Sequence, residues 1–366
     1  MDIQYKRRIE KIEAQLALSL PDSEGYDAAW IQNVFGLDLI GSGFVRQLAA
    51  PGRELLKRGG KRWRPLLALL VCETLGGGDT VLPLLPLVEF CHNASLIHDD
   101  IEDNSDRRRG KPALHLLYGL DTALNSGCFL YFLPLACIPR WNASVEWKNS
   151  LYGTWAEHVS RLHLGQSMDI GWHREFGSLP SLDDYYTMCR FKTGCLARFA
   201  SVLGVYAASA ALDMPPGNPG SGHLVEKFGE AAEKLGVGFQ ILDDVKNLRE
   251  GVPGKKRGDD IVEGKKSLPV LLFLHGADEI DGRRQQVSRC FDAARRGGTT
   301  VPEVEELIAA MENAGAVEKA LLEGKKLINE ACETFSASSI ITSSLSAFPV
   351  NTESRTLLAG IASLIG

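Results

Sequence analysis

The sequence predicts an all-α fold, built as a single antiparallel helical bundle, and three observations support this prediction. Apolar positions recur mostly at helical spacing along the 366-residue chain. The breaks between periodic segments are short clusters of Gly, Pro or Asp, without the turn signals of β-hairpins. No stretch has the low-complexity composition of a long linker, so one domain over residues 1–366 is expected.

Each expected helix is a periodic apolar segment that ends at one of these breaks. The expected helices cover residues 3–19, 61–75, 80–103, 120–138, 145–171, 182–211 and 223–247, followed by shorter helices in the C-terminal third. The expected loops cover residues 76–78, 104–112, 177–181, 214–222 and 251–258, and a Ser/Thr-rich stretch at 336–346 precedes a last helix at 353–365. Two of these loops directly follow acidic helix ends.

Charge and cysteine usage exclude several classes of protein. The formal net charge of −6 lacks the excess of Lys and Arg that a nucleic-acid surface needs. The eight Cys residues form no Cys-x-x-Cys pair and have no neighbouring His at zinc-ligand spacing, so we expect reduced thiols in a cytoplasmic protein. The N-terminus lacks an apolar signal segment, and no window approaches eighteen uninterrupted apolar residues, so no membrane span is expected.

A first acidic cluster ends the apolar helix expected at residues 80–103. Asp99 and Asp103 are one helical turn apart on the same face, and Asp100 is adjacent. Like charges at this spacing repel each other, and a helix C-terminus disfavours anions, so the cluster needs a cation. A solvated acidic face is the simpler alternative, but the preceding residues are apolar almost without a break. Oxygen ligands without Cys or His indicate magnesium or calcium, and too few ligands for a closed cage favour magnesium shared with a phosphate-bearing substrate.

A second acidic cluster repeats this arrangement, because Asp243 and Asp244 again end an apolar helix. Two such helix ends that face each other across a bundle would hold metal ions between them. Basic clusters follow the two acidic helix ends, and another opens the helix at residue 61. They include Lys61, Arg62, Arg64, Arg107, Arg108, Arg109, Lys255, Lys256, Lys265 and Lys266. Such side chains bind diphosphates, although Arg62 and Lys256 are expected to be plain solvated loop residues.

The motifs in combination resemble those of the trans-isoprenyl diphosphate synthases, the farnesyl, geranylgeranyl and longer polyprenyl diphosphate synthases. The resemblance covers about residues 59–269, and residues 270–366 are expected to be C-terminal helices. The matching motifs are Gly-Lys-Arg-x-Arg-Pro, His92 before the first Asp-rich motif, Asp-Asp-x-x-Asp followed by Arg-Arg-Gly-Lys-Pro, Lys-Thr, Phe-Gln-x-x-Asp-Asp and Gly-Lys-x-Ser-Leu-Pro. The resemblance implies an isoprenoid-synthase bundle with a large central cavity, and a homodimer.

The resemblance also implies the site residues. Asp99, Asp100, Asp103 and Asp243 would bind magnesium, about three ions in all, with Asp244 and Asp169 supporting that shell. Isopentenyl diphosphate would meet Lys61, Arg64, His92 and Arg109, while the allylic diphosphate would meet Arg108, Lys192, Lys255 and Lys265. Gln166, Thr193 and Gln240 would line the reaction centre. His92 could otherwise be a core histidine, but a lysine such as Lys192 inside an apolar helix is costly unless it is paired.

The expected reaction follows from the charges. Metal ions and basic side chains would stabilise the departing diphosphate, so that the allylic C–O bond ionises and the isopentenyl double bond attacks the carbocation. Two departures from the family pattern stand out: Asn247 replaces an Asp of the second motif, which should weaken metal binding there, and Arg107 is an extra charge before the Arg pair.

The length of the product depends on the residues below Asp99. Ser95, Ala94 and Cys91 lie four, five and eight positions earlier, about 6 to 12 Å deeper along the helix, and all three are small. Family members that form farnesyl diphosphate carry an aromatic residue at the fourth or fifth position. We therefore expect a product longer than farnesyl, with Phe129, Phe132 or a neighbour as the floor.

Three alternatives remain at this point. One is a synthase that stops at farnesyl or geranylgeranyl diphosphate. A terpene cyclase shares the fold and the first acidic motif, but would have little use for Lys61, Arg64 and His92. A non-catalytic regulatory subunit of a prenyl synthase is the third, and Asn247 is its only support.

Overall fold

The computed structural model describes residues 3–22, 25–37, 42–174, 179–250, 257–276, 280–337 and 348–364. These residues form an almost entirely helical protein, as expected. The chain divides into two compact units. The first unit comprises Met1–Val159, Leu196–Ala232 and Cys332–Ile365, and the second comprises Ser160–Cys195 and Glu233–Ala331. No observation tests the prediction of a single domain.

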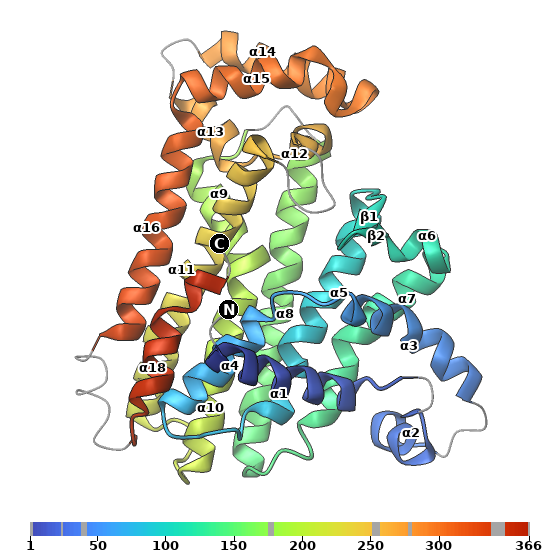
Figure 1. Cartoon of the computed structure of the whole chain (residues 1–366), viewed down its shortest axis with the longest axis vertical. Coiled ribbons are helices and arrows are strands. Elements are labelled where there is room, and N and C mark those ends of the chain that lie inside the picture. The colour runs from blue at the N-terminus through green and yellow to red at the C-terminus, as the bar shows by residue number, and fades with distance from the viewer. Residues whose placement is uncertain are drawn as a thin grey trace. The chain divides into compact units, whose positions relative to one another are not determined.

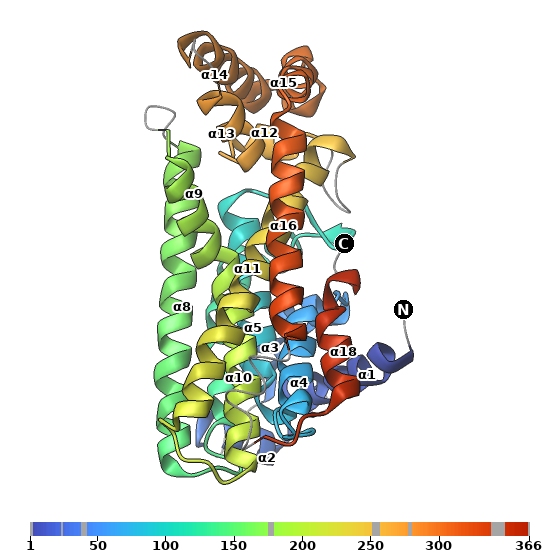
Figure 2. The ribbon, with the colours of Figure 1, turned by 90° about the vertical axis from the view of Figure 1, so that its left-hand side faces the viewer.

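The first unit contains most of the helices. Its elements are α1 (Ile3–Ser19), α2 (Ala28–Phe35), α3 (Ser42–Lys57), α4 (Trp63–Thr74), η2 (Leu82–Leu84), α5 (Pro86–Glu102), α6 (Leu114–Tyr118), α7 (Leu120–Phe132), η3 (Leu133–Cys137), α10 (Cys195–Ala211), α18 (Thr352–Ala359) and η6 (Ile361–Leu364). Helix α5 packs against α4 and α7, and α18 lies beside α4 in both views (Figures 1 and 2). Every residue of α4 is buried, so this helix forms the centre of the first unit's core.

The second unit has a core of its own. Its elements are α9 (Leu182–Cys189), the π-helical turn η4 (Arg190–Gly194), α12 (Asp259–Glu263), α13 (Leu268–His275), α14 (Ile280–Gly297), η5 (Gly298–Thr300) and α15 (Pro302–Asn313). Helices α14 and α15 pack together (Figure 2). Three long helices contribute to both units: α8 (Val145–Arg174), α11 (Pro219–Arg249) and α16 (Ala316–Ser336).

Local chemistry explains where several helices begin. Ser181 opens α9 with a reciprocal capping box, in which its hydroxyl accepts from Asp184 N–H while the Asp184 carboxylate accepts from Ser181 N–H. The side chain of Asp27 caps α2 by accepting from Trp30 N–H at 2.8 Å. Pro86 occupies the first position of α5, where the missing N–H costs nothing.

The observed elements differ from the expected ones at several positions, and α11 begins at Pro219, inside the loop expected at 214–222. Helices α2 and α3 were not expected, because Pro51 and Gly52 interrupt the pattern of α3. A short antiparallel hairpin of β1 (Arg107–Arg108) and β2 (Lys111–Pro112) replaces the loop at 104–112. The helix expected at 182–211 contains the π-helical turn. The helix expected at 80–103 begins at Pro86, after η2. Most of the loop at 336–346 and residues 251–256 of another loop lie outside the described residues.

One helical run is long and apolar enough to be compared with a membrane span. It covers Leu182–Ala211, with a mean hydropathy of 1.3 in its most apolar window, and 78% of that window is buried inside the protein. A mostly buried core helix meets the same criterion, so this run is weak support for a span.

Candidate active site

The first Asp-rich motif lies at the C-terminal end of α5, in the first unit. Asp100 is buried, and Arg108 donates to its Oδ1 from Nε at 2.8 Å and from Nη2 at 2.5 Å. The same guanidinium lies 3.4 Å from Asp99 Oδ2. Burial raises the pKa of Asp100, Arg108 opposes this rise, and the neighbouring Asp99 adds to it. The motif brings three carboxylates to the end of α5, and Arg108 contacts Asp99 and Asp100.

The β1–β2 hairpin fixes which arginines face the site. Arg58 holds it through bonds to the carbonyl oxygens of Arg108, at 3.0 Å, and of Pro112, at 2.9 Å. Arg109 has a φ of 52° and donates to the carbonyl of Leu55 and to the Asn93 side chain. Arg107 is exposed and bonds only locally to the carbonyl of Gly110, at 2.7 Å. Arg108 and Arg109 thus make contacts with buried parts of the first unit and Arg107 does not, while the role of this pair at a diphosphate stays a prediction.

A cationic cluster surrounds His92 on α5. Burial lowers the pKa of His92 well below its usual value, and the positive charges of Arg64, Arg109, Arg108 and Arg62 lower it further. His92 is therefore neutral at pH 7, and the guanidinium groups around it leave a surplus of positive charge. Burial also lowers the pKa of Arg109 to about 10, with a smaller contribution from neighbouring arginines. Such a cluster fits a diphosphate.

Three of the four residues predicted to bind isopentenyl diphosphate thus lie within one electrostatic environment: Arg64, His92 and Arg109. The Arg64 guanidinium also lies over the ring of Trp63, 4.4 Å from its centroid. Lys61 is exposed at the start of α4, next to the glycines that open the motif.

The prediction that Arg62 is a solvated loop residue was wrong. Arg62 is only 3% exposed and forms ion pairs with Glu13, at 2.7 Å, and with Glu89, at 2.6 Å. Its backbone has a φ of 50°, which turns the side chain into the core. The sequence gives little sign of this, because Glu13 and Glu89 are far away along the chain.

The second Asp-rich motif lies on α11, in the second unit. Asp243 is exposed, whereas Asp244 is buried. Asp244 accepts from Tyr185 Oη at 3.0 Å and from Gln240 Nε2 at 2.9 Å, and Gln240 Oε1 accepts from Thr193 at 2.8 Å. Burial raises the pKa of Asp244 to about 7, and the negative charge of Asp260 contributes to this rise. Gln240, Thr193 and Asp244 are therefore linked, and Asp243 presents its carboxylate outward.

Lys192 and Asp169 form an ion pair, which the spacing of the two residues did not predict. Lys192 Nζ lies 2.5 Å from Asp169 Oδ2, and His173 Nε2 lies 2.9 Å from Oδ1. Burial alone would raise the pKa of Asp169, but Lys192 and His173 hold it below its usual range. Lys192, in its apolar helix, is thus paired with a carboxylate of the protein. This pairing offsets the free-energy cost of burying its charge. Its role at a phosphate, and that of Asp169 near a metal, stay predictions.

Lys265 also lies in the second unit, between carboxylates of α12. Its Nζ is 3.2 Å from Asp260 Oδ1 and 2.6 Å from Glu263 Oε2. Lys255 lies outside the described residues. Asn247 is buried, and its Oδ1 accepts from the backbone N–H of Asp260 at 3.3 Å. This amide therefore connects α11 to the start of α12.

The residues predicted to line the prenyl path occupy different environments. Ser95 is half-buried, and its hydroxyl donates to the carbonyl of His92 at 2.8 Å. Ala94 and Cys91 have no exposed surface. Phe129 stacks on Phe35 with 5.8 Å between ring centroids, and Phe132 is 62% exposed.

The donor atoms fit magnesium that is shared with a substrate. Among the described residues, no three His, Cys, Asp or Glu side chains converge into a ready-made cage. Both Asp-rich motifs instead supply carboxylate oxygens, the hard donor atoms that magnesium prefers. Open sites of this kind are completed by phosphate oxygens and water. In the first unit Asp99 is half-buried, and in the second unit Asp243 is exposed, so each motif has a carboxylate that an ion can reach from solvent.

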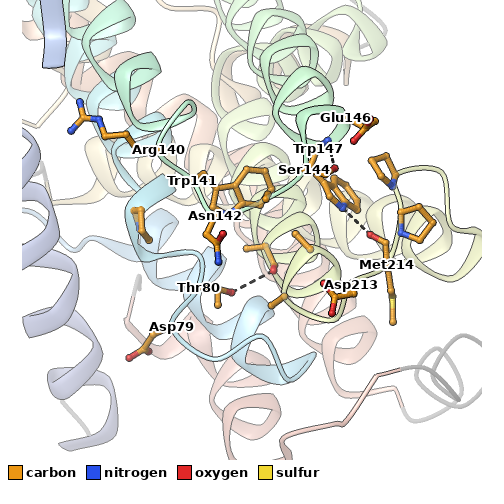
Figure 3. Close-up of a pocket in the computed structure, with 17 residues that line it drawn as sticks. Asp79, Thr80, Arg140, Trp141, Asn142, Ser144, Glu146, Trp147, Asp213 and Met214 are labelled. Atoms are coloured by element: carbon orange, nitrogen blue, oxygen red, sulfur yellow. Dashed lines mark hydrogen bonds between the residues drawn. The ribbon is translucent and has the colours of Figure 1, made fainter.

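A cleft of about 880 Å³ lies elsewhere in the first unit (Figure 3). Its walls come from the segment before α5, the start of α8 and the end of α10, and include Thr80, Trp141, Trp147 and Met214. Trp147 Nε1 donates to the carbonyl of Met214 at 2.8 Å and fixes one wall. None of the predicted site residues lines this cleft.

Comparisons with known proteins agree with the motifs. The polyprenyl synthetase family matches residues 45–311. A geranylfarnesyl diphosphate synthase of Aeropyrum pernix is 34% identical over 250 residues, which cover 66% of this chain and 73% of the relative. A crystal structure of geranylgeranyl pyrophosphate synthetase from Pyrococcus horikoshii has a TM-score of 0.76 and 25% identity, over 99% of this chain and 96% of that chain.

A second solved structure has the same fold and shows a metal in that protein. It is a geranylgeranyl pyrophosphate synthase from Corynebacterium glutamicum, complexed with isoprenyl diphosphate and magnesium, with a TM-score of 0.73 and 23% identity over 96% of each chain. The helical fold, the paired acidic motifs and the family match define an isoprenoid synthase. The chain belongs to the polyprenyl synthetase family, the trans-isoprenyl diphosphate synthases, and is a prenyltransferase.

Proposed function

We propose that this prenyltransferase condenses isopentenyl diphosphate with an allylic diphosphate and releases an all-trans prenyl diphosphate longer than farnesyl. The observation that carries this proposal is the positive charge of Arg64 and Arg109 near the neutral His92. A second diphosphate needs such a cluster, whereas a cyclase that acts on one allylic diphosphate does not. The relatives named as geranylgeranyl and geranylfarnesyl synthases support a product beyond farnesyl.

The residues divide the chemistry between them. Magnesium, when bound, supplies positive charge that stabilises the leaving diphosphate. The magnesium would be held by the carboxylates of Asp99, Asp100, Asp103 and Asp243, with Asp244 as support. The allylic diphosphate would be contacted by Arg108, Lys192 and Lys265. Arg64, Arg109 and Lys61 hold the isopentenyl diphosphate, with neutral His92 among them. The released diphosphate accepts the proton, so no protein nucleophile is required.

A homodimer in the cytoplasm completes the proposal. Its support is a set of exposed apolar side chains on α6 and α7: Leu116, Leu117, Leu120 and Leu124, which are 46 to 58% exposed. Apolar surface of this kind is typical of a protein interface. All eight Cys residues are free thiols, which agrees with a reducing compartment.

The test is an extension assay. The purified protein is incubated with magnesium, labelled isopentenyl diphosphate and, in separate tubes, dimethylallyl, geranyl, farnesyl or geranylgeranyl diphosphate. We expect incorporation, products longer than farnesyl, and loss of activity in EDTA. An Asp99→Asn variant should lose at least about 100-fold in rate, because it removes stabilisation of the developing charge.

The alternatives give other results in the same assay. Products that stop at farnesyl would contradict the proposed length. A hydrocarbon released from an allylic primer alone would indicate a cyclase. Absence of incorporation with every primer, even at raised magnesium, would favour a regulatory subunit.

A further inference from the structure

Tyr185 on α9 lies in the hydrophobic core of the second unit, although it carries a hydroxyl group. Its exposed fraction is 0%, and Met188 and Val245 belong to the same core cluster. A buried hydroxyl group without a hydrogen-bond partner costs free energy, whereas a phenylalanine would fill the same space without that cost. The hydroxyl group of Tyr185 therefore needs a partner inside the core.

The partner of this hydroxyl group belongs to the second Asp-rich motif. Tyr185 Oη donates to Asp244 Oδ2 at 3.0 Å, and Gln240 Nε2 donates to Asp244 Oδ1 at 2.9 Å. Asp244 is only 4% exposed, so solvent offers it few other donors. Each carboxylate oxygen thus has a donor of its own, and the group cannot turn about its χ2 torsion without losing both bonds.

The hydrogen bonds continue from Asp244 to the π-helical turn, because Gln240 Oε1 accepts from Thr193 Oγ1 at 2.8 Å. Tyr185 and Thr193 lie on α9 and η4, which follow each other directly, while Gln240 and Asp244 lie one turn apart on α11. The four side chains therefore tie α9 and η4 to the acidic end of α11 at two points. Tyr185 is the member of this network that no motif in the sequence identified.

The position of Tyr185 does not depend on Asp244 alone. Its backbone N–H donates to the carbonyl oxygen of Ser181 at 3.0 Å, in the first turn of α9, which the capping box of Ser181 and Asp184 stabilises. Its ring meets the ring of Tyr186 edge-on, with 5.8 Å between the centroids and 73° between the planes. The hydroxyl group is thus held in place by its own helix, and the carboxylate takes the orientation that this donor sets.

We propose that Tyr185 is a positioning residue of the second Asp-rich motif, and that its hydroxyl group orients the Asp244 carboxylate and so strengthens metal binding there. Removal of a group that hydrogen-bonds to a metal-binding carboxylate typically weakens metal affinity by about 10- to 100-fold. Tyr185 acts through Asp244, so it is not itself a catalytic residue. This inference rests on the proposed function, in which the second motif binds magnesium, and adds a residue to it.

The experiment compares Tyr185→Phe with Tyr186→Phe, because each replacement removes one hydroxyl group and keeps the ring. Tyr186 is half-buried, and its hydroxyl group forms no hydrogen bond with any residue that the structure describes. Electron paramagnetic resonance measures the binding of Mn²⁺ in the presence of inorganic pyrophosphate, and the extension assay gives the magnesium concentration for half-maximal rate. We expect Tyr185→Phe to weaken Mn²⁺ binding and to raise this magnesium concentration, each by about 10-fold, and Tyr186→Phe to change either by less than about 2-fold.

A double variant separates positioning from a general structural role. Asp244→Asn alone should weaken Mn²⁺ binding, because it removes the carboxylate. The double variant Tyr185→Phe/Asp244→Asn should bind Mn²⁺ as Asp244→Asn does, since the hydroxyl group has no carboxylate left to orient. An independent structural role of Tyr185 would instead add its own loss to that of Asp244→Asn. Circular dichroism shows whether each variant is folded.

The outcomes separate this inference from the proposed function. If folded Tyr185→Phe binds Mn²⁺ as tightly as the wild type, Tyr185 does not position the motif, while the proposed function stands. If Tyr186→Phe weakens binding as much, the effect is a general loosening of α9 and the inference is wrong. If the wild type extends no primer, the proposed function itself fails and this inference fails with it. Should Tyr185→Phe alone not fold, the double variant decides: an affinity below that of Asp244→Asn overturns the proposal, and an equal affinity supports it.

Discussion

Lys192 Nζ lies 2.5 Å from Asp169 Oδ2, and both groups are largely shielded from water. A lysine that is expected to contact a diphosphate is thus held by a carboxylate when no substrate is present. The pair fixes the ammonium in one position, and it makes the stability of the second unit depend on a charge inside it.

The first prediction concerns how this ion pair contributes to the free energy of unfolding, and how that contribution changes at acid pH. Asp169→Asn keeps the shape but removes the charge, and should cost about 3 kcal/mol of unfolding free energy at pH 7, because it removes the carboxylate that Lys192 contacts. The folded pKa of Asp169 is held low, so its contribution is complete above about pH 5 and is lost as the pH falls towards the folded value. Urea unfolding in EDTA should show the difference between the two proteins shrinking steadily as the pH falls below about 4. A constant difference would contradict this explanation.

The second prediction concerns His92, whose pKa is lowered in the folded protein. A histidine that is paired with a carboxylate would instead have a raised pKa. The folded protein keeps His92 neutral, while the unfolded chain takes up a proton below about pH 6.5. Stability should therefore fall as the pH drops from 7 to 5, by at most about 1.4 kcal/mol per pH unit for this one proton. His92→Gln cannot titrate and should lose that part of the dependence. Unfolding curves at several pH values provide the measurement, and identical slopes would count against a His92 that is neutral in the folded protein.

The third prediction compares neighbours in the motif that opens α4. Arg62→Met leaves Glu89 buried without its cation and should destabilise the protein by about 3–5 kcal/mol. Lys61→Met changes an exposed side chain and should alter stability by no more than about 0.5 kcal/mol, while raising KM for isopentenyl diphosphate. Thermal unfolding and steady-state kinetics separate the two effects. If Lys61→Met left KM unchanged, the proposed role of Lys61 would have to be abandoned.

The fourth prediction concerns the contact of α8 with the π-helical turn. A Cβ atom on Gly165 would lie 2.3 Å from the backbone nitrogen of Lys192, so Gly165→Ala must push the two segments apart. We expect a loss of about 1–3 kcal/mol and a lower kcat, because Lys192 moves with its backbone. Gly171→Ala on the same helix meets nothing within 4 Å and should stabilise the protein by about 0.5–1 kcal/mol. Equal effects of the two substitutions would show that helix propensity, and not the close contact, governs Gly165.

Sequence reasoning found the motifs because their chemistry is local. The spacing of Asp99, Asp100 and Asp103 follows from one helical turn, and the excess charge around them is visible in the sequence. The family pattern likewise placed Arg64, His92 and Arg109 together, and the charges of both arginines do lower the pKa of His92, while the role of the three residues stays a prediction. The all-α fold could be predicted for the same reason, since apolar periodicity is a local property.

Long-range pairings could not be predicted in this way. Arg62 pairs with Glu13 and Glu89, and the φ of 50° that turns it inward has no sequence signal. Helix α3 was missed because Pro51 and Gly52 lower local helix propensity, although Gly52 is needed where Leu130 packs closely against it.

The π-helical turn at Arg190–Gly194 has a consequence for how this protein relates to others of its fold. Such a turn arises when one residue is inserted into an α-helix, and it shifts everything on one side by about 100° around the axis. Deleting a single residue here would leave a regular helix of nearly the same composition, but Lys192 and Thr193 would no longer meet Asp169 and Gln240. A one-residue gap at this position in an aligned sequence would therefore mark a chain that kept the scaffold and lost these pairings.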